Sequence, residues 1–268
     1  MIADEKLTHG NRIRSVSKAV RILVRVADAD DGVSAKDVAE GLGMPIATAH
    51  HLLSTLVAER MLSKDLRRRY HLGPLVGALT EAYQRRPGPP EWLLEPLRML
   101  ATDTGETAYL SGWMHDEAVV LATMEGSHAV RVQGLHTGFA GSAHARASGK
   151  VFLAFSEPAQ RDRHLSRHVL EPLTPNTITD PATLQDELAR IADRGYALDL
   201  EEFTLGVRCV SAPVLSGRVA AYAYTVSVPR DRFDREREAL IAAVLRAASA
   251  AEIEGGVEDR LEDKKASA

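Results

Sequence analysis

Residues 34–56, "SAKDVAEGLGMPIATAHHLLSTL", constrain the fold of this chain more than any other stretch. Ser34 followed by Asp37 predicts a capping box at the start of a short helix. Gly43 suits the end of that helix, and Pro45 suits the first turn of another. The segment therefore predicts two short helices joined by a tight turn. Helices of this length are not stable alone and need neighbours to pack against.

The second of these helices has an apolar face and a polar face. Its predicted buried stripe consists of Ala49, Leu52, Leu53 and Leu56. Small and polar side chains occupy the opposite face: Ala47, Thr48, His50, His51 and Ser54. By itself, such a face fits a solvated surface, a metal site or a binding surface.

Elements on either side complete a small unit of three helices and a hairpin. Upstream, Ser15 and Ser17 are candidate N-caps of a helix. An apolar stripe recurs along that helix at Val16, Val20, Leu23, Val24 and Ala27. Downstream, residues 61–64 and 69–72 are predicted strands joined by the basic turn "DLRR". This order predicts a winged helix-turn-helix.

The distribution of charge favours a nucleic-acid partner for this unit. The net charge of the whole chain is only −4, but residues 11–72 contain 11 Lys and Arg against 7 Asp and Glu. We expect the polar helix face to contact DNA, because imidazoles and hydroxyls hydrogen-bond phosphates and base edges. Phosphate contacts dominate affinity, and we assign them to Lys64, Arg67, Arg68 and Arg69. The sequence leaves open whether His50 and His51 contact bases or phosphates.

The rest of the chain predicts a second, larger domain of helices and strands. A helical segment is followed by "PGPP" at 87–90, which breaks the chain. Predicted strands then lie at 107–114, 118–125, 129–135, 207–215 and 219–228, with helices between them. We predict an α+β chain in four parts. They are a DNA-binding domain at 11–72, a linker helix and hinge at 73–88, an effector-binding domain at 89–254 and a disordered tail at 255–268.

Composition limits where such a chain works. Cys209 is the only cysteine, so no intramolecular disulfide can form, as is usual in a reducing compartment. No apolar run approaches the roughly 18–20 residues of a membrane span. The first residues do not form a secretory signal. We expect a cytoplasmic protein that does not bind membranes.

Known catalytic and metal-binding patterns are missing from the sequence. "ARASGKV" has Val151 where a phosphate loop needs Ser or Thr, and no G-x-S-x-G occurs. His164 and His168 have the i, i+4 spacing of a shared metal site, but no cysteine or compact carboxylate partner stands nearby. We therefore predict no catalytic residue, no cofactor and no metal site.

Several ordered motifs resemble the IclR family of bacterial transcriptional regulators. They are "SVSKAVRIL", "DVAEGLGMPIATAHHLLSTL", "YHLG", "TGETAYL", "HARASGKVFLAF", "LTPNTITDPATLQDELARIADRGYALDLEE" and "GVRCVSAPV". The resemblance implies a winged helix-turn-helix, a linker helix and a GAF-like effector domain. It also implies double-stranded operator DNA and a small-molecule effector as partners, and assembly as a homodimer or a dimer of dimers.

The resemblance also implies where the effector binds, in many members an organic acid. The family's pocket positions fall on Ala147, Ser148, Asp199, Cys209, Thr225 and Ser227. Main-chain N–H groups at the start of a helix favour a carboxylate, and Thr225 and Ser227 point to one side of a strand. The alternative function is a small-molecule-binding protein or enzyme that uses its winged helix to contact another protein.

Overall fold

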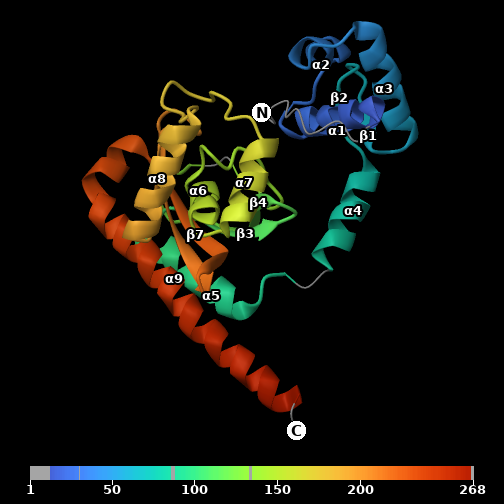
Figure 1. Cartoon of the computed structure of the whole chain (residues 1–268). Helices are drawn as coiled ribbons and strands as arrows, with labels where there is room; N and C mark the ends of the chain where they lie inside the picture. The colour runs from blue at the N-terminus through green and yellow to red at the C-terminus, as the bar shows by residue number, and fades with distance from the viewer. Residues whose placement is uncertain (1–12, 30, 86–87, 133–134, 267–268) are drawn as a thin grey trace. The chain divides into compact units, whose positions relative to one another are not determined.

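The chain folds as two units, residues 1–88 and residues 89–268 (Figure 1). The structure is a computed structural model and describes residues 13–29, 31–85, 88–132 and 135–266. Within these ranges, no helix combines the length and the apolar character needed to cross a membrane. The two units are described separately.

The first unit contains four helices and a two-stranded hairpin. The helices are α1 (Arg14–Ala27), α2 (Ala35–Gly41), α3 (Ile46–Ala58) and α4 (Pro74–Gln84). The hairpin pairs β1 (Leu62–Lys64) with β2 (Tyr70–Leu72) in antiparallel register. An isolated bridge between Val33 and Tyr70 ties the hairpin to the segment before α2. The predicted winged helix-turn-helix is confirmed.

The local signals at the start of α2 and along α3 are those read from the sequence. The Ser34 hydroxyl accepts a hydrogen bond from the Asp37 backbone N–H at 3.2 Å, and the Asp37 carboxylate accepts one from the Ser34 N–H at 3.1 Å. This reciprocal pair is a capping box. On α3, Ala49, Leu53 and Leu56 are buried, and Leu52 is partly buried beside them. The predicted apolar face of α3 is therefore the packed one.

The start and the packed face of α1 differ from the prediction. The N-cap is Ile13, whose side chain makes no capping hydrogen bond, rather than Ser15 or Ser17. Val16 and Val20 are exposed, whereas Ile22 and Val26 are the buried residues. Apolar side chains lie on two faces of α1, and contact with α3 and β2 selects the second one. The spacing of apolar residues in the sequence does not show which of these two faces of α1 is buried.

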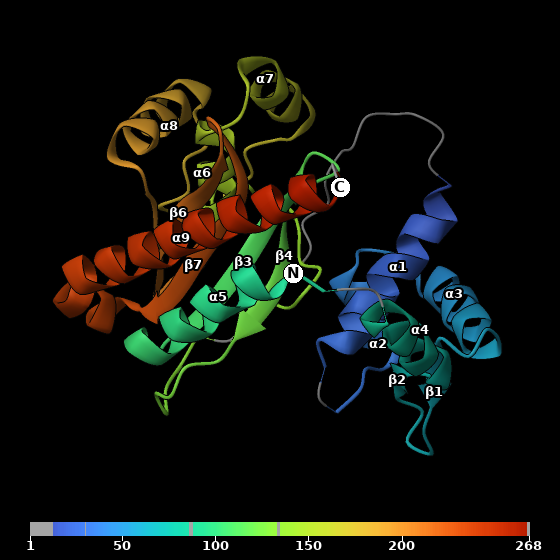
Figure 2. The same cartoon turned by 90° about the horizontal axis from the view of Figure 1, so that it is seen from below.

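The second unit is built on a five-stranded antiparallel sheet in the order β4-β3-β7-β6-β5. Its strands are β3 (Thr107–Met114), β4 (Glu117–Met124), β5 (Ala197–Leu200), β6 (Val207–Ser216) and β7 (Val219–Pro229). Its helices are α5 (Glu91–Thr104), α6 (Ala147–Ala154), α7 (Pro158–Arg167), α8 (Pro181–Arg194) and α9 (Arg230–Ala266). Helices cover both faces: α5 and α9 pack on one, and α6, with α8 against it, packs on the other (Figure 2).

Two predicted strand assignments need correction. Residues 129–132, expected to begin a strand, are not in one, and β5 had not been predicted. The alternating pattern "AVRV" resembles a strand, but the Val132 carbonyl accepts a hydrogen bond from the Thr107 hydroxyl at 2.8 Å instead of from a neighbouring strand. β5 is only four residues long, too short to show a pattern.

The carboxyl-terminal range also differs from the expectation. Residues 255–268 are predicted as a disordered tail, whereas α9 continues to Ala266. Seven of the twelve residues 255–266 are Glu, Arg, Leu, Lys or Ala, which have high helix propensity, so a helix already formed can propagate through them despite Gly255 and Gly256.

Gly149 on α6 is in close contact with the chain that precedes the helix. A Cβ built there would lie 2.3 Å from the Ala143 carbonyl oxygen, which is a backbone atom. We expect Gly149→Ala to lower the free energy of unfolding by about 2 kcal/mol, the usual cost of overpacking.

Gly77 on α4 provides the matched control, because a Cβ there meets nothing within 4 Å. We expect Gly77→Ala to raise the free energy of unfolding by about 0.5–1 kcal/mol through helix propensity. Urea unfolding followed by circular dichroism measures both variants. Equal effects of the two substitutions would contradict the packing argument.

Candidate functional site

The polar face of α3 lies on the surface of the first unit. Ala47, His50, His51 and Ser54 are exposed, and Thr48 is half-buried. These are the residues predicted to contact DNA. A helix that follows a tight turn and is anchored by a buried apolar face can present such residues to a major groove. The structure places them together on one surface.

The basic residues of the wing have two different roles. Arg67 and Arg68 lie in the turn between β1 and β2 and are exposed. Lys64 lies with its Nζ 5.0 Å from the centre of the Tyr70 ring.

Arg69 is held inside the unit instead. Its Nη2 and Nε donate to the Gly32 carbonyl oxygen at 2.7 and 3.2 Å. These bonds hold β2 to the loop between α1 and α2. Its donors to Gly32 help to position the wing, and the predicted contact of Arg69 with phosphate stays a prediction.

In the second unit, strand register gathers polar side chains on one face of the sheet. Asp199 pairs with Cys209, Cys209 pairs with Ser227, and Ser227 pairs with Thr107. Residues directly opposite each other in an antiparallel sheet point to the same side. The four therefore form one row across β5, β6, β7 and β3, on the face that α6 covers. All four are buried.

A second row runs beside the first. Ser211 pairs with Thr225, and Thr225 pairs with Tyr109. The Thr225 hydroxyl donates to the Ser211 Oγ at 2.9 Å, and the Ser211 hydroxyl donates to the Tyr224 carbonyl at 2.9 Å. Thr225 and Ser227 thus lie on the same face, as the resemblance implies.

Arg146 is the N-cap residue of α6 and adds a buried positive charge to this region. Its side chain donates to the carbonyl oxygens of Gly141 and Ala118, at 3.1 and 3.2 Å, and to the Ser148 Oγ at 3.1 Å. The guanidinium carbon lies 5.1 Å from the centre of the Phe139 ring. Only 3% of Arg146 is exposed.

The charge of Arg146 is not neutralised within the described part of the chain. No carboxylate oxygen of a described residue lies within 4 Å of it, and its Nε has no hydrogen-bond partner there. Burial lowers the pKa of Arg146 to about 10, although Cys209, Glu117 and Asp199 partly counter this shift. The side chain remains a cation at neutral pH. Burying an unpaired cation costs free energy, and an anion bound beside it would offset that cost.

Asp199 closes the turn that follows β5. Its Oδ1 accepts hydrogen bonds from the backbone N–H groups of Glu202 and Phe203, at 2.7 and 3.3 Å. Burial raises the pKa of Asp199 to about 7, against the opposing effect of the Lys150 ammonium. Lys150 itself is fully buried and forms an ion pair with Glu202. The carboxyl group of Asp199 therefore titrates near neutral pH.

Cys209 lies between these polar groups. Its Sγ is 3.1 Å from the Ser227 Oγ, and burial raises the pKa of the thiol far above its usual value. A thiol in this state is not a nucleophile at neutral pH. Its position in the first polar row makes Cys209 part of the wall of the candidate site.

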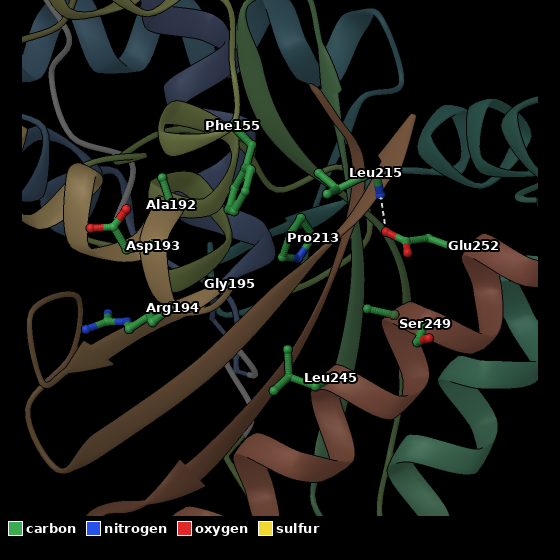
Figure 3. A pocket seen from close by; sticks show the side chains of 11 residues that line it. Phe155, Ala192, Asp193, Arg194, Gly195, Pro213, Leu215, Leu245, Ser249 and Glu252 are labelled. Atoms are coloured by element: carbon green, nitrogen blue, oxygen red, sulfur yellow. Dashed lines mark hydrogen bonds between the residues drawn. The ribbon is translucent and has the colours of Figure 1, made fainter. Parts of the chain in front are cut away.

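A separate groove lies elsewhere in the second unit (Figure 3). Residues of α8, β6 and α9 line it, including Arg194, Pro213, Leu215 and Glu252. The Glu252 carboxylate accepts a hydrogen bond from the Leu215 N–H at 2.7 Å across its edge. The groove does not include any residue of the two polar rows.

Family models match both units. The model described as bacterial transcriptional regulator IclR C-terminal matches residues 92–253, and the model described as IclR helix-turn-helix domain matches residues 15–66. The chain belongs to the IclR family. It is accordingly a DNA-binding transcriptional regulator with an effector domain, in a family of regulators rather than enzymes.

Curated relatives agree with this over most of the chain. The regulator BhcR of Paracoccus denitrificans is 36% identical over 88% of this chain and 85% of its own length. The regulator Rv1719 of Mycobacterium tuberculosis is 32% identical over 91% of this chain and 93% of its own. The crystal structure of the Thermotoga maritima IclR superposes with a TM-score of 0.65 at 26% identity, covering 91% of this chain and 99% of that one.

Sequence reasoning missed Arg146 in this IclR-family effector domain. The signal was present: Arg146 interrupts a run of small residues in "SAHARASGK", just before a helix start. Ser211 and Tyr109 were also missed, because only strand register shows that they share a face with Thr225.

The wing arginines of this IclR-family chain should separate into two classes. Arg67→Ala and Arg68→Ala should weaken binding to all DNA sequences, and each should reduce the slope of log affinity against log salt by about 0.9. Neither should change the unfolding free energy, because both side chains are exposed.

Arg69→Ala serves as the contrast, since it removes two hydrogen bonds to Gly32. We expect it to lower the unfolding free energy by about 1–2 kcal/mol. Gel shifts across salt concentrations and thermal unfolding measure these effects. Identical behaviour of the three variants would contradict the assignment.

Asp199 should give the effector domain a pH-dependent stability. Its pKa is raised from 3.8 to about 7 in the folded chain, so between these values the folded state holds a proton that the unfolded state has lost. The free energy of unfolding should therefore fall as pH rises from about 4 to 7, and level off above.

Asp199→Asn should remove this contribution, because the amide oxygen can still accept from Glu202 and Phe203 while no carboxyl titrates. The stability of the variant relative to the original chain should increase from pH 5 to pH 8 in urea titrations. If the free energies of unfolding of the two proteins changed in parallel with pH, the raised pKa of Asp199 would be contradicted.

Proposed function

We propose that this regulator changes its affinity for operator DNA when a small organic acid binds beside Arg146. The observation that carries the proposal is the buried Arg146 guanidinium, which has no carboxylate partner among the described residues. A ligand carboxylate would neutralise it by a charge-assisted, two-pronged hydrogen bond. The first N–H groups of α6 add further donors at the same place.

The two polar rows would determine which acid binds. Asp199, Ser227 and Thr225 offer carboxyl and hydroxyl groups to a ligand, and Cys209 offers a small apolar contact. Ala147 and Ser148, at the start of α6, complete the wall opposite the sheet. The pattern suits an acid that also carries hydroxyl or carbonyl groups. A homologue from Microbacterium hydrocarbonoxydans, 22% identical with a TM-score of 0.62, was solved with 4-hydroxybenzoate, which is such an acid.

On the DNA side, α3 would enter the major groove and the wing would contact phosphates. Thr48, His50 and His51 would face base edges, while Lys64, Arg67 and Arg68 would bind the backbone. A single helix reads only a half-site, so we propose a homodimer or a dimer of dimers. Support comes from α1, where Ile13, Val16 and Val20 form an exposed apolar stripe at i, i+3 and i+7. A second copy of the chain would cover it.

A panel of small carboxylic acids, each paired with its neutral amide, tests the effector proposal. Binding to the folded chain must raise its melting temperature, and we expect a rise with at least one acid and not with its amide. The same acid should shift the binding curve for DNA from upstream of the chain's own gene. Equal responses to acids and amides would contradict a role for the Arg146 charge.

Arg146→Gln is the decisive variant. We expect it to weaken binding of the acid by roughly 10- to 100-fold, the usual loss for a charged hydrogen bond. DNA binding in the absence of the acid should be unchanged, because Arg146 and α3 lie in different units. Normal affinity for the acid in this variant would place the effector elsewhere.

A further inference from the structure

A cluster of three metal-ligating side chains lies outside the effector rows. Glu117 is the first residue of β4, His164 lies on α7, and His168 follows the end of α7. One ligand atom from each residue lies within 4.8 Å of those from the other two. The Nε2 of His168 is 2.9 Å from the Glu117 Oε1.

Backbone carbonyls orient both imidazole rings. The Nδ1 of His164 lies 2.7 Å from the Asp116 carbonyl oxygen, and the Nδ1 of His168 lies 2.8 Å from the His164 carbonyl oxygen. A carbonyl oxygen can only accept, so each Nδ1 carries the proton and donates it. In a neutral ring the lone pair is therefore on Nε2, and the 2.9 Å separation between the His168 Nε2 and the Glu117 Oε1 requires a proton or a cation between these two atoms. Metal-binding histidines are usually held by the same kind of outer hydrogen bond.

Aromatic rings pack against the buried side of the cluster. The two imidazole rings are stacked, with centroids 4.0 Å apart and planes inclined by 28°. Trp113 packs against His164 at 5.2 Å between ring centroids. His164 is only 2% exposed, while the Glu117 side chain keeps 20% of its surface exposed. The cluster is thus buried on the histidine side and open to solvent at Glu117.

Three basic side chains lie near the cluster, and one of them, Arg146, interacts electrostatically with Glu117. Arg163 and Arg167 lie on the same helix, but their guanidinium groups contact the Asp116 carboxylate. The second oxygen of Glu117 is buried and has no hydrogen-bond partner among the described residues. A negative oxygen in this state gains most from a cation.

We propose that Glu117, His164 and His168 bind a divalent transition-metal ion, with Zn²⁺ as the best fit. Two imidazole nitrogens and one carboxylate oxygen suit zinc, and three protein ligands leave a fourth position for water. At metal–ligand distances of about 2.0–2.2 Å, tetrahedral ligand atoms lie about 3.3 Å apart. The ligand atoms lie within 4.8 Å of one another, and the stacked imidazole rings must turn apart for both Nε2 atoms to face one ion.

A metal ion bound here would connect α7 to the β3–β4 hairpin, beside the residues that hold Arg146. The Ala118 carbonyl, which accepts from Arg146, belongs to the residue after Glu117. Gly141 also lies between the two, because its backbone helps to lower the pKa of Glu117 and its carbonyl accepts from Arg146. Metal binding would thereby alter how Arg146 is held. This coupling rests on the proposed effector function, whereas the metal site itself does not.

Metal uptake by the full-length chain tests the site. After removal of metals with a chelator and dialysis, we expect the protein to take up one Zn²⁺ per chain and to melt at a higher temperature with zinc. Co²⁺ in the same site should give the visible absorption bands of a tetrahedral complex. Failure to retain zinc would overturn the proposal without affecting the effector test, which uses acids on metal-free protein.

Three substitutions assign the ligands. In His164→Asn and His168→Asn, the amide N–H can replace Nδ1–H as donor to the carbonyl, but Nε2 is lost. Glu117→Gln keeps the shape of the side chain and removes its charge. Each should weaken zinc binding by more than roughly 10- to 100-fold, the loss expected for an outer-sphere partner alone.

His51→Gln is the control, because it removes an exposed histidine of the first unit. It should leave zinc affinity unchanged. Melting temperatures without metal show whether each variant folds, and Glu117→Gln keeps the test valid if a histidine variant does not. Zinc affinity equal to that of the original chain in a folded variant would overturn the assignment. A loss as large in His51→Gln would indicate surface binding and would also overturn it.

Discussion

Both faces of the five-stranded sheet are buried, and the rest of the second unit depends on this constraint. Side chains alternate between the faces, so β6 sends Val210 and Ala212 towards α5 and α9, and Cys209 and Ser211 towards α6. The first face is an apolar core. The second carries polar groups that are withdrawn from water and must find partners. A buried polar face of this kind is costly as structure and useful as a binding site.

Arg146 illustrates the free-energy cost of burying a charged group on this face of the sheet. Its guanidinium is held by two backbone carbonyls and a serine hydroxyl, which satisfy its hydrogen bonds but not its charge. Two other buried charges in the unit are matched: Lys150 pairs with Glu202, and Arg232 pairs with Glu106. Arg146 differs from these two residues, because no carboxylate of the described residues pairs with it. Because electrostatic interactions are strong where water is excluded, one unmatched charge can dominate the choice of ligand.

Much of the first unit could be predicted because its signals are local. The Ser34–Asp37 capping box and the apolar face of α3 depend on residues within a few positions of each other. Prediction failed where distant partners decide. The buried face of α1 is chosen by α3 and β2, and the sequence does not show that Arg69 donates to the Gly32 carbonyl. The i, i+4 spacing of His164 and His168 was visible, but Glu117 comes from a distant hairpin.

The sequence by itself determined the family, the two kinds of domain and the residue types available at the effector positions. These follow from local order: capping residues, helical periodicity and the order and spacing of the motifs. Only the tertiary structure decided which polar side chains share a face, because a pairing register between strands far apart in the chain sets that. It also decided that Arg146 is buried without a carboxylate partner among the described residues. Burial and the absence of a nearby countercharge depend on the residues that surround a side chain in space, and a local sequence pattern does not predict them.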